Sequence, residues 1–386
     1  METACPLLWN HFCSSVTSTV MPCCRVDQRN DLGEWKNNNI NDGIYSTNHI
    51  ETRNLMRKGI RPKVCNVCYA KEDLGIGSSR LNYLKIYKDI DYTQEPDRVL
   101  TADVKFNNTC NLACRMCGPF SSSLIASLLK DIPQEDRIHN VRITKYNYKE
   151  EEKLEYCKKL IKNGLKEFKT TGGEPFYQKY FIRLLDWCIE NNYNKGLIIK
   201  ITTNGINLDK KTINKLLSFK ECHLSISIDG YGNVYEYIRY PGKWSDIDIN
   251  LNKLIQYASD TFKINISTLL NIYNLFDIPN IERYLKSIGY HDELNLECYI
   301  KPYHQSELNV KNLSNNLLDL AIERNGNKRL IKYLTQVKEE NKDNFLLKEF
   351  IRKTKIYDIQ RNQSYEILDT NIVKLIGENY DCNYYY

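Results

Sequence analysis

Residues 101–117 read Thr-Ala-Asp-Val-Lys-Phe-Asn-Asn-Thr-Cys-Asn-Leu-Ala-Cys-Arg-Met-Cys, and this stretch decides the fold. Its first part, Ala102–Phe106, is a candidate strand. Three cysteines follow directly, Cys110, Cys114 and Cys117, with the spacing C-x3-C-x2-C. Parallel α/β folds place their functional groups on loops that follow strands. We therefore take this loop as the centre of a candidate site and work outward from it.

Strand-like and helix-like stretches alternate on the C-terminal side of this loop. The candidate strands are Ala102–Phe106, Lys166–Thr170, Leu197–Thr202, His223–Ile228, Lys263–Leu269 and Leu294–Ile300. Between them lie the candidate helices Glu150–Asn163, Tyr180–Asn191, Asp209–Ser218, Ile247–Ser259 and Ile278–Ser287. Six strands that alternate with helices predict an α/β fold with a parallel sheet and right-handed crossovers. Because eight units would be needed to close a barrel, we expect a partial (β/α)6 TIM-like barrel over residues 101–304.

Polar and glycine-rich motifs follow three of the later strands. They are Thr170-Thr-Gly-Gly-Glu174-Pro, Ile201-Thr-Thr-Asn204-Gly205 and Ser225-Ile-Ser227-Ile-Asp229-Gly230. Each motif alone is more often ordinary turn chemistry. Together with the cysteine loop they make four such endings on four successive strands, which favours one shared site.

Three closely spaced thiolates are compatible with two kinds of metal site. They can bind three irons of a [4Fe–4S] cube and leave the fourth iron without a protein ligand. They can also supply three ligands to zinc, with the fourth from elsewhere in the chain. The cysteine spacing alone does not choose between the two.

Residues 102–300 resemble the core of the radical S-adenosylmethionine (SAM) superfamily, with its CxxxCxxC loop, its GGE motif and its strand-end SAM contacts. The resemblance implies a [4Fe–4S] cluster on Cys110, Cys114 and Cys117, with SAM as a further cofactor. It also implies reductive cleavage of SAM to a 5′-deoxyadenosyl radical, which abstracts a hydrogen from a bound substrate.

The same resemblance implies which residues contact SAM. Its amino group is assigned to Glu174 and the backbone of Gly172 and Gly173, and its carboxylate to Arg239. The remaining assignments are Asn204, Ser227 and Asp229 to the ribose or carboxylate, and Met116, where the family often has an aromatic residue, to the adenine.

Cysteine is also concentrated ahead of the candidate barrel. Of the 14 cysteines, nine lie before residue 118 and six of these precede residue 101, among them Cys5, Cys23 and the CxxC pair Cys65 and Cys68. Four thiolates can close either a zinc site or a fully ligated iron–sulfur cluster, and spacing leaves both open. Cys24 is an alternative to Cys23 as a ligand.

The order of these cysteines resembles the Twitch module, the shorter relative of the SPASM domain that carries one auxiliary [4Fe–4S] cluster. The resemblance continues through Leu32-Gly33, Trp35 and Arg53, and through Cys117–Ser123. It implies a branch of radical SAM proteins with the module N-terminal to the core, and so an auxiliary cluster on Cys5, Cys23, Cys65 and Cys68. We expect the module to occupy residues 1–100, with Cys13 in its core.

Composition and charge limit the other function classes. The 54 Lys and Arg residues exceed the 48 Asp and Glu residues by only 6, and they form no continuous basic run, so a nucleic-acid partner is not expected. No apolar stretch is long enough to span a membrane, and residues 1–22 do not have the pattern of a signal peptide. We expect a cytoplasmic protein.

Residues 305–386 are helical and polar in pattern, and we consider them as a cover for the active site. The predicted enzyme is a radical SAM oxidoreductase whose substrate is a peptide, a protein or a small molecule. It would need an electron donor such as flavodoxin or ferredoxin. The alternative is a non-catalytic binding protein stapled by zinc or by an iron–sulfur cluster.

Overall fold

A computed structural model of the chain describes residues 2–26, 39–73, 75, 77–133, 148–297, 306–340 and 342–378. Residues 32–35 of the Twitch resemblance and residues 298–300 of the last candidate strand lie outside them. No helix of the described part is long and apolar enough to cross a membrane.

One eight-stranded sheet organises the molecule, with the strand order β2-β1-β3-β4-β5-β6-β7-β8. All neighbouring strands are parallel except β1 and β2, which are antiparallel. The strands are β1 His11–Ser14, β2 Val20–Met21, β3 Thr101–Val104, β4 Glu167–Thr170, β5 Ile198–Thr203, β6 Glu221–Ser227, β7 Phe262–Leu269 and β8 Asn295–Glu297. Strands β3 to β8 confirm the six predicted strands.

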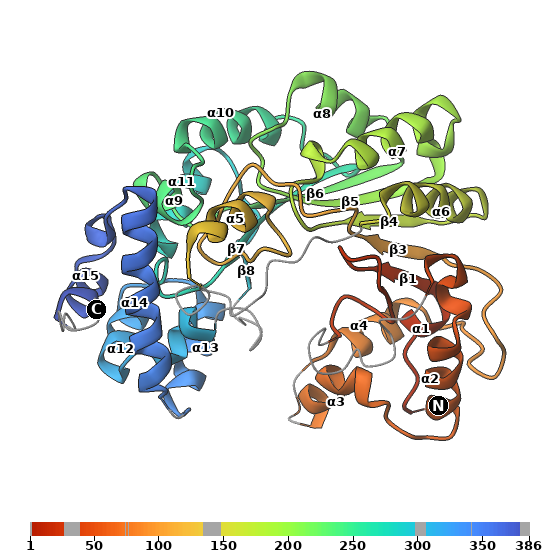
Figure 1. The fold of residues 1–386 in the computed structure, drawn as a ribbon, viewed down its shortest axis with the longest axis horizontal. Helices are drawn as coiled ribbons and strands as arrows, with labels where there is room; N and C mark the ends of the chain where they lie inside the picture. The colour runs from red at the N-terminus through yellow and green to blue at the C-terminus, as the bar shows by residue number, and fades with distance from the viewer. Residues whose placement is uncertain are drawn as a thin grey trace.

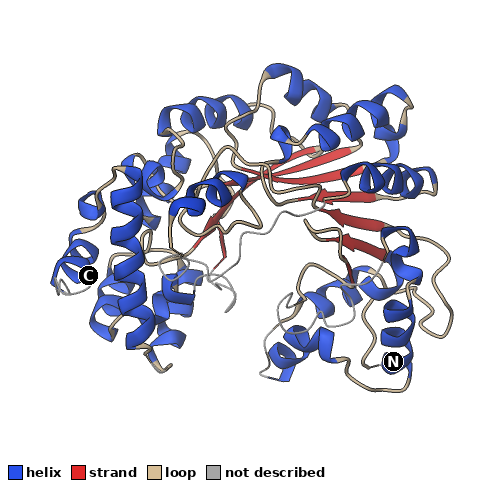
Figure 2. Cartoon of the chain, viewed as in Figure 1, coloured by secondary structure: helices blue, strands red, loops and turns tan. Residues whose placement is uncertain are grey.

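The sheet is curved, and most of the crossover helices follow the outside of the curve (Figures 1 and 2). These are α6 Glu150–Lys162, α7 Lys179–Glu190, α8 Lys210–Leu217, α10 Trp244–Ile255 and α11 Ile278–Ser287, close to the five predicted helices. The short helices α5 Ser123–Leu128 and α9 Asn233–Ile238 complete this part. A curved parallel sheet with outer helices agrees with the predicted partial barrel.

The N-terminal helices and the C-terminal helices lie at opposite ends of the curved sheet (Figure 1). The N-terminal helices are α1 Leu7–Asn10, α2 Thr47–Arg57, α3 Asn66–Asp73 and α4 Ser79–Ile86. The C-terminal helices are α12 Asn315–Glu323, α13 Lys328–Lys338, α14 Asn344–Arg361 and α15 Thr370–Glu378. The helical character predicted for residues 305–386 is therefore present in the part of this range that the structure describes, residues 306–340 and 342–378.

Local sequence explains why the helices begin and end where they do. Helix α6 has three glutamates in its first turn and two lysines in its last turn, which complement the helix dipole. Helix α8 is capped by Asp209, whose side chain accepts a hydrogen bond from the backbone N–H of Thr212 at 2.7 Å. Strands β5 and β6 alternate buried and half-buried residues, as expected for a sheet covered by helices on one face.

The N-terminal region is joined to the barrel through the sheet, because β1 pairs with β3. It also has a small core of its own, which includes Leu8, Trp9, Met56 and Cys13. Cys13 lies on β1 and is 1% exposed, as expected of a core residue.

A buried lysine joins β1 to β3 where both strands end. Lys153 of α6 has no exposed surface, and its ammonium donates to four backbone carbonyls at 2.8–3.0 Å. The carbonyls belong to Ser15 and Val16 after β1 and to Lys105 and Phe106 after β3. This cation therefore fixes the start of the loop that carries the three cysteines.

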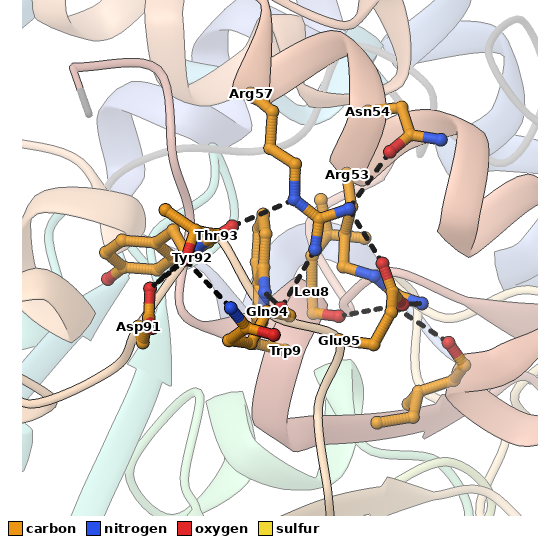
Figure 3. A network of polar contacts seen from close by, with 11 residues as sticks. Leu8, Trp9, Arg53, Asn54, Arg57, Asp91, Tyr92, Thr93, Gln94 and Glu95 are labelled. Atoms are coloured by element: carbon orange, nitrogen blue, oxygen red, sulfur yellow. Dashed lines mark hydrogen bonds and ion pairs between the residues drawn. The ribbon is translucent and has the colours of Figure 1, made fainter.

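Two arginines of α2 fix the segment that leads into β3 (Figure 3). The buried Arg53 donates to the carbonyls of Leu8 at 3.0 Å and Ile44 at 2.8 Å, and it forms an ion pair with Glu95 at 2.5 Å. Arg57 reaches the other oxygen of Glu95 at 2.7 Å. The N-terminal helices are thus tied to the chain just ahead of the barrel.

Candidate active site

The loop with the three cysteines follows β3 and is held by backbone hydrogen bonds to the segment after α9. Ala113 N–H donates to the carbonyl of Tyr240 at 2.6 Å, and Arg115 N–H donates to that of Ile238 at 2.8 Å. The N–H of Cys117 donates to the carbonyl of Cys114 at 3.0 Å. The loop is therefore held in place by backbone hydrogen bonds to the rest of the fold.

The three thiols of this loop are neighbours. Burial raises the pKa of Cys110 to about 12, and the Cys114 thiolate adds to that effect. A hydrogen bond from Cys117 and the positive charges of Arg239 and Arg361 lower the pKa of Cys114, against its burial. The hydrogen bond with Cys114, together with burial, raises the pKa of Cys117. One thiolate in this group is thus favoured before any metal binds.

The GGE motif after β4 packs directly on the cysteine loop. Glu174 N–H donates to the carbonyl of Thr109 at 2.8 Å, and Gly173 N–H donates to that of Ser121 at 3.1 Å. Gly173 has φ +60°, and a Cβ there would lie 2.5 Å from the Thr109 oxygen. Gly172, at φ +83°, also needs the left-handed region. Glycine is required where these two loops meet.

The Glu174 side chain is 1% exposed and points to the end of β5. Its carboxylate accepts from the Thr203 hydroxyl and the Asn204 N–H, each at 2.7 Å, and from the Phe176 N–H at 3.2 Å. Burial raises the pKa of Glu174 to about 6, although these hydrogen bonds oppose the shift. A carboxylate offers about four acceptor positions, so one remains beyond these three bonds.

Asn204 connects the end of β5 to the cysteine loop. Its amide donates to the side-chain oxygen of Asn111 at 2.7 Å, and Asn111 lies next to Cys110. Glu174 therefore acts on the cysteine loop in two ways, through its own backbone and through Asn204.

Asp229 and Arg239, predicted as separate SAM contacts, form an ion pair with each other. Two guanidinium nitrogens of Arg239 lie 2.7 and 2.5 Å from one oxygen of Asp229, and the other oxygen accepts from Leu269 N–H at 2.7 Å. The third nitrogen of Arg239 donates to the sulfur of Cys114 at 3.8 Å. The pair thus links the end of β6 to the candidate cluster ligand.

The other two predicted SAM contacts, Ser227 and Met116, are half-buried. Ser227 is the last residue of β6 and is half-buried. Met116, on the cysteine loop, is also half-buried and packs against the main core. Their contacts with SAM stay predictions.

Arg115, next to Cys114, is a site residue that sequence reasoning missed. It is 1% exposed, stacks on the ring of Tyr237 with 3.6 Å to the ring centroid, and forms an ion pair with Asp358 of α14. Asp358 also accepts from the N–H of Tyr365 at 2.8 Å. The C-terminal helices therefore contact the cysteine loop, although no local sequence signal joins positions 243 residues apart.

The four N-terminal cysteines predicted as ligands also lie together. The charge of Cys68 adds to the burial that raises the pKa of Cys5 to about 12. Burial, followed by the charges of Cys5, Cys23 and Cys68, raises the pKa of Cys65. Burial likewise raises the pKa of Cys23, and the contributing charges include those of Cys5 and Cys68. Each of the four thus lies within electrostatic range of the other three.

Both groups suit a cluster by their donor chemistry. Among the described residues no group of three His, Cys, Asp or Glu side chains has the arrangement to hold one metal ion. A [4Fe–4S] cluster is bound by cysteine thiolates on separate irons, so it does not require that arrangement. Thiolates of the kind that three neighbouring cysteines on one loop and four cysteines of the N-terminal region can supply are the ligands that such clusters use.

Comparison with curated proteins gives partial matches. GTP 3′,8-cyclase from Campylobacter fetus subsp. fetus is 33% identical over 111 residues, 28% of each chain. GTP 3′,8-cyclase from Nautilia profundicola is 26% identical over 182 residues, 46% of this chain and 48% of the relative. The matches therefore span about half or less of the length of these relatives.

Among solved structures, Streptococcus suis SuiB bound to S-adenosylmethionine matches at 15% identity and a TM-score of 0.37, covering 66% of this chain and 48% of SuiB. The protein anSMEcpe with bound AdoMet matches at 18% identity and a TM-score of 0.40, covering 58% and 60%.

The family comparison falls on the part of the chain that holds the site. Residues 104–285 match the model of the Radical SAM superfamily. The matched range begins on β3, contains the cysteine loop and the endings of β4, β5 and β6, and closes within α11. The match thereby supports the radical SAM superfamily for the central domain of this chain.

Proposed function

We propose that the chain is a radical SAM enzyme whose [4Fe–4S] cluster is held by Cys110, Cys114 and Cys117. The observation that carries the proposal is the meeting of these three thiols with the ends of β4, β5 and β6. The GGE loop, Asn204 and Arg239 each hydrogen-bond to the cysteine loop or to a cysteine on it. Bound there, the cluster and SAM would supply an electron and a 5′-deoxyadenosyl radical for hydrogen abstraction.

The chain's own residues would bind and orient SAM. The left-handed backbone at Gly172 and Gly173 would bring the GGE loop against the amino group, and Glu174 would provide negative charge. Arg239 would face the SAM carboxylate while Asp229 holds its guanidinium in place. In the same proposal Asn204 and Ser227 approach the ribose or carboxylate, and Met116 packs on adenine.

We further propose that Cys5, Cys23, Cys65 and Cys68 hold an auxiliary [4Fe–4S] cluster, as in a Twitch module. Their mutual proximity supports this assignment. Such a cluster can accept an electron from a product radical, which favours net oxidation of a peptide, a protein or a small molecule. Flavodoxin or ferredoxin would supply the electron for SAM cleavage.

The cyclase activity named for the two curated relatives is not part of the proposal. The matched segments cover 28% and 46% of this chain, and the larger is less identical than the smaller. The radical SAM match covers residues 104–285, so the N-terminal cysteines and the C-terminal helices lie outside it.

Anaerobic reconstitution tests the proposal. Reduced with dithionite in the presence of SAM, the protein should form 5′-deoxyadenosine, and the triple variant Cys110→Ala, Cys114→Ala, Cys117→Ala should not. Cys188→Ala, a buried cysteine of α7 outside both groups, is the matched control and should keep the activity.

Iron content separates the two cysteine groups. The wild type should bind about eight irons per chain and the triple variant about four, since each cube holds four. Zinc at both sites, with no SAM cleavage, would instead establish the alternative of a non-catalytic binding protein.

A further inference from the structure

Arg361, the last residue of α14, is buried without a hydrogen-bond partner. It is 5% exposed, and none of its three guanidinium nitrogens has a partner within the part of the chain that the structure describes. Its guanidinium lies over the ring of Tyr357 at 3.9 Å and near that of Tyr240 at 5.2 Å, measured to the ring centroids. Aromatic faces attract a cation but do not accept its hydrogen bonds in the plane of the guanidinium.

The nearest acid on the same helix is already used. Asp358 pairs with Arg115 through one oxygen and accepts from the Tyr365 N–H through the other. Of the two buried arginines, Arg115 is therefore paired with this carboxylate and Arg361 is not. A buried charge that lacks a partner is costly, so the arrangement calls for a further anion.

Two observations place that anion at the cysteine loop. Asp358, three residues before Arg361 on α14, forms an ion pair with Arg115, the residue that follows Cys114 in the cysteine loop. In addition, Tyr240, which lies under the Arg361 guanidinium, accepts the hydrogen bond of Ala113 through its carbonyl. The unpaired guanidinium and the three thiols thus border the same segment.

We propose that Arg361 is a positioning residue for the cluster, supplied by the C-terminal helix as a counter-charge to the thiolate-bound iron–sulfur cube. This inference rests on the proposed function. Arg239 is paired with Asp229, whereas the guanidinium of Arg361 has no hydrogen-bond partner among the described residues, so its charge stays available to an added anion. Its role is to favour the more negative, reduced form of the cluster.

The reduction potential of the cluster in Arg361→Met tests this role. Removing a positive charge disfavours the gain of an electron, so reduction should become about tenfold less favourable, or about 59 mV more negative for one electron. Arg361→Lys keeps the charge and should stay near the wild type. Arg352→Met, on the same helix at a half-buried ion pair with Glu349, is the control for the loss of one positive charge.

The potential is measured anaerobically, without SAM, by redox titration followed by electron paramagnetic resonance. The relevant signal is the one absent from the Cys110, Cys114 and Cys117 triple variant. An unchanged potential in Arg361→Met, with the cluster bound, would overturn the inference. If Arg361→Met also binds SAM more weakly while its potential is unchanged, the anion that Arg361 faces would be the SAM carboxylate and not the cluster.

Thermal unfolding provides a readout that a merely structural arginine would not give. Without the cluster, Arg361→Met should be at least as stable as the wild type, because it removes an unpaired buried charge. With the cluster, the variant should gain less stability on reconstitution than the wild type. A wild-type protein that takes up no iron at this loop would refute the proposed function itself, whereas normal uptake with unchanged reconstitution stability refutes only the role of Arg361.

Discussion

Glu174→Gln is the substitution whose effect can be worked out most directly from the site. The carboxylate is 1% exposed and holds Thr203, Asn204 and Phe176 through three hydrogen bonds. Glutamine keeps the shape, but its amide group cannot accept on both sides. One of the donors now bonded to the carboxylate would be left without an acceptor, which costs about 1–3 kcal/mol of unfolding free energy.

The dependence on pH isolates the charge from this loss of a hydrogen bond. Burial raises the pKa of Glu174 from 4.5 to about 6. Because the folded-state pKa is the higher one, the folded protein favours the neutral acid, and the associated stability is complete below pH 4.5. It is lost as the pH rises through about 6. A shift of about 1.5 units corresponds to about 2 kcal/mol.

The measurement is the unfolding free energy of the metal-free protein by urea denaturation, at pH 4 and at pH 7.5. Between pH 4 and pH 7.5, the unfolding free energy of the wild type should fall by about 2 kcal/mol relative to that of Glu174→Gln. Glu190→Gln, an exposed position at the end of α7, is the control for loss of one negative charge. An increase in the unfolding free energy of the wild type relative to the variant at pH 7.5 would refute the reasoning, because hydrogen bonding would then outweigh burial in setting the pKa of Glu174.

Three further predictions, made with four substitutions, test the remaining contacts. Gly173→Ala should lower the melting temperature and the iron content together, because its Cβ would lie 2.5 Å from the Thr109 oxygen at φ +60°; a variant with normal iron would contradict the close packing of the two loops. Cys23→Ser should lose the N-terminal iron while Cys24→Ser keeps it, and the reverse result would exchange the two ligands. Lys153→Met should cost at least about 3 kcal/mol in urea denaturation, because several buried carbonyls lose their donor; a loss below about 1 kcal/mol would mean that water replaces the ammonium.

The sequence predicted the barrel because its signal is local and repeated. The strands from β3 to β8 are short and alternate with helices along the chain, and parallel pairing follows from the crossovers. Strands β1 and β2 have four and two residues, too short for a periodic signal. The place of β1 in the sheet depends on its pairing with β3, about 90 residues later, which no local pattern indicates, and β2 pairs with β1.

The site was predicted in outline for the same reason. Motifs at the ends of parallel strands converge whatever their side chains do, so the cysteine loop, Glu174, Asn204 and Asp229 could be expected at one edge. The sequence did not indicate which of these side chains would pair with each other. Asp229 pairs with Arg239, and Glu174 points to Asn204, because burial demands a partner for each charge before any ligand arrives.

The charges around the cysteine loop show why the C-terminal helices belong to the site. Arg239 is balanced by Asp229, and Arg115 is balanced by Asp358, whereas Arg361 has no acid of its own among the described residues. Cysteine ligands bind metal as thiolates, so a cluster bound as proposed would add negative charge beside an arginine that has no hydrogen-bond partner among the described residues. That arginine comes from α14, which lies outside residues 104–285 that match the family model. The helix would therefore contribute electrostatically to the proposed site.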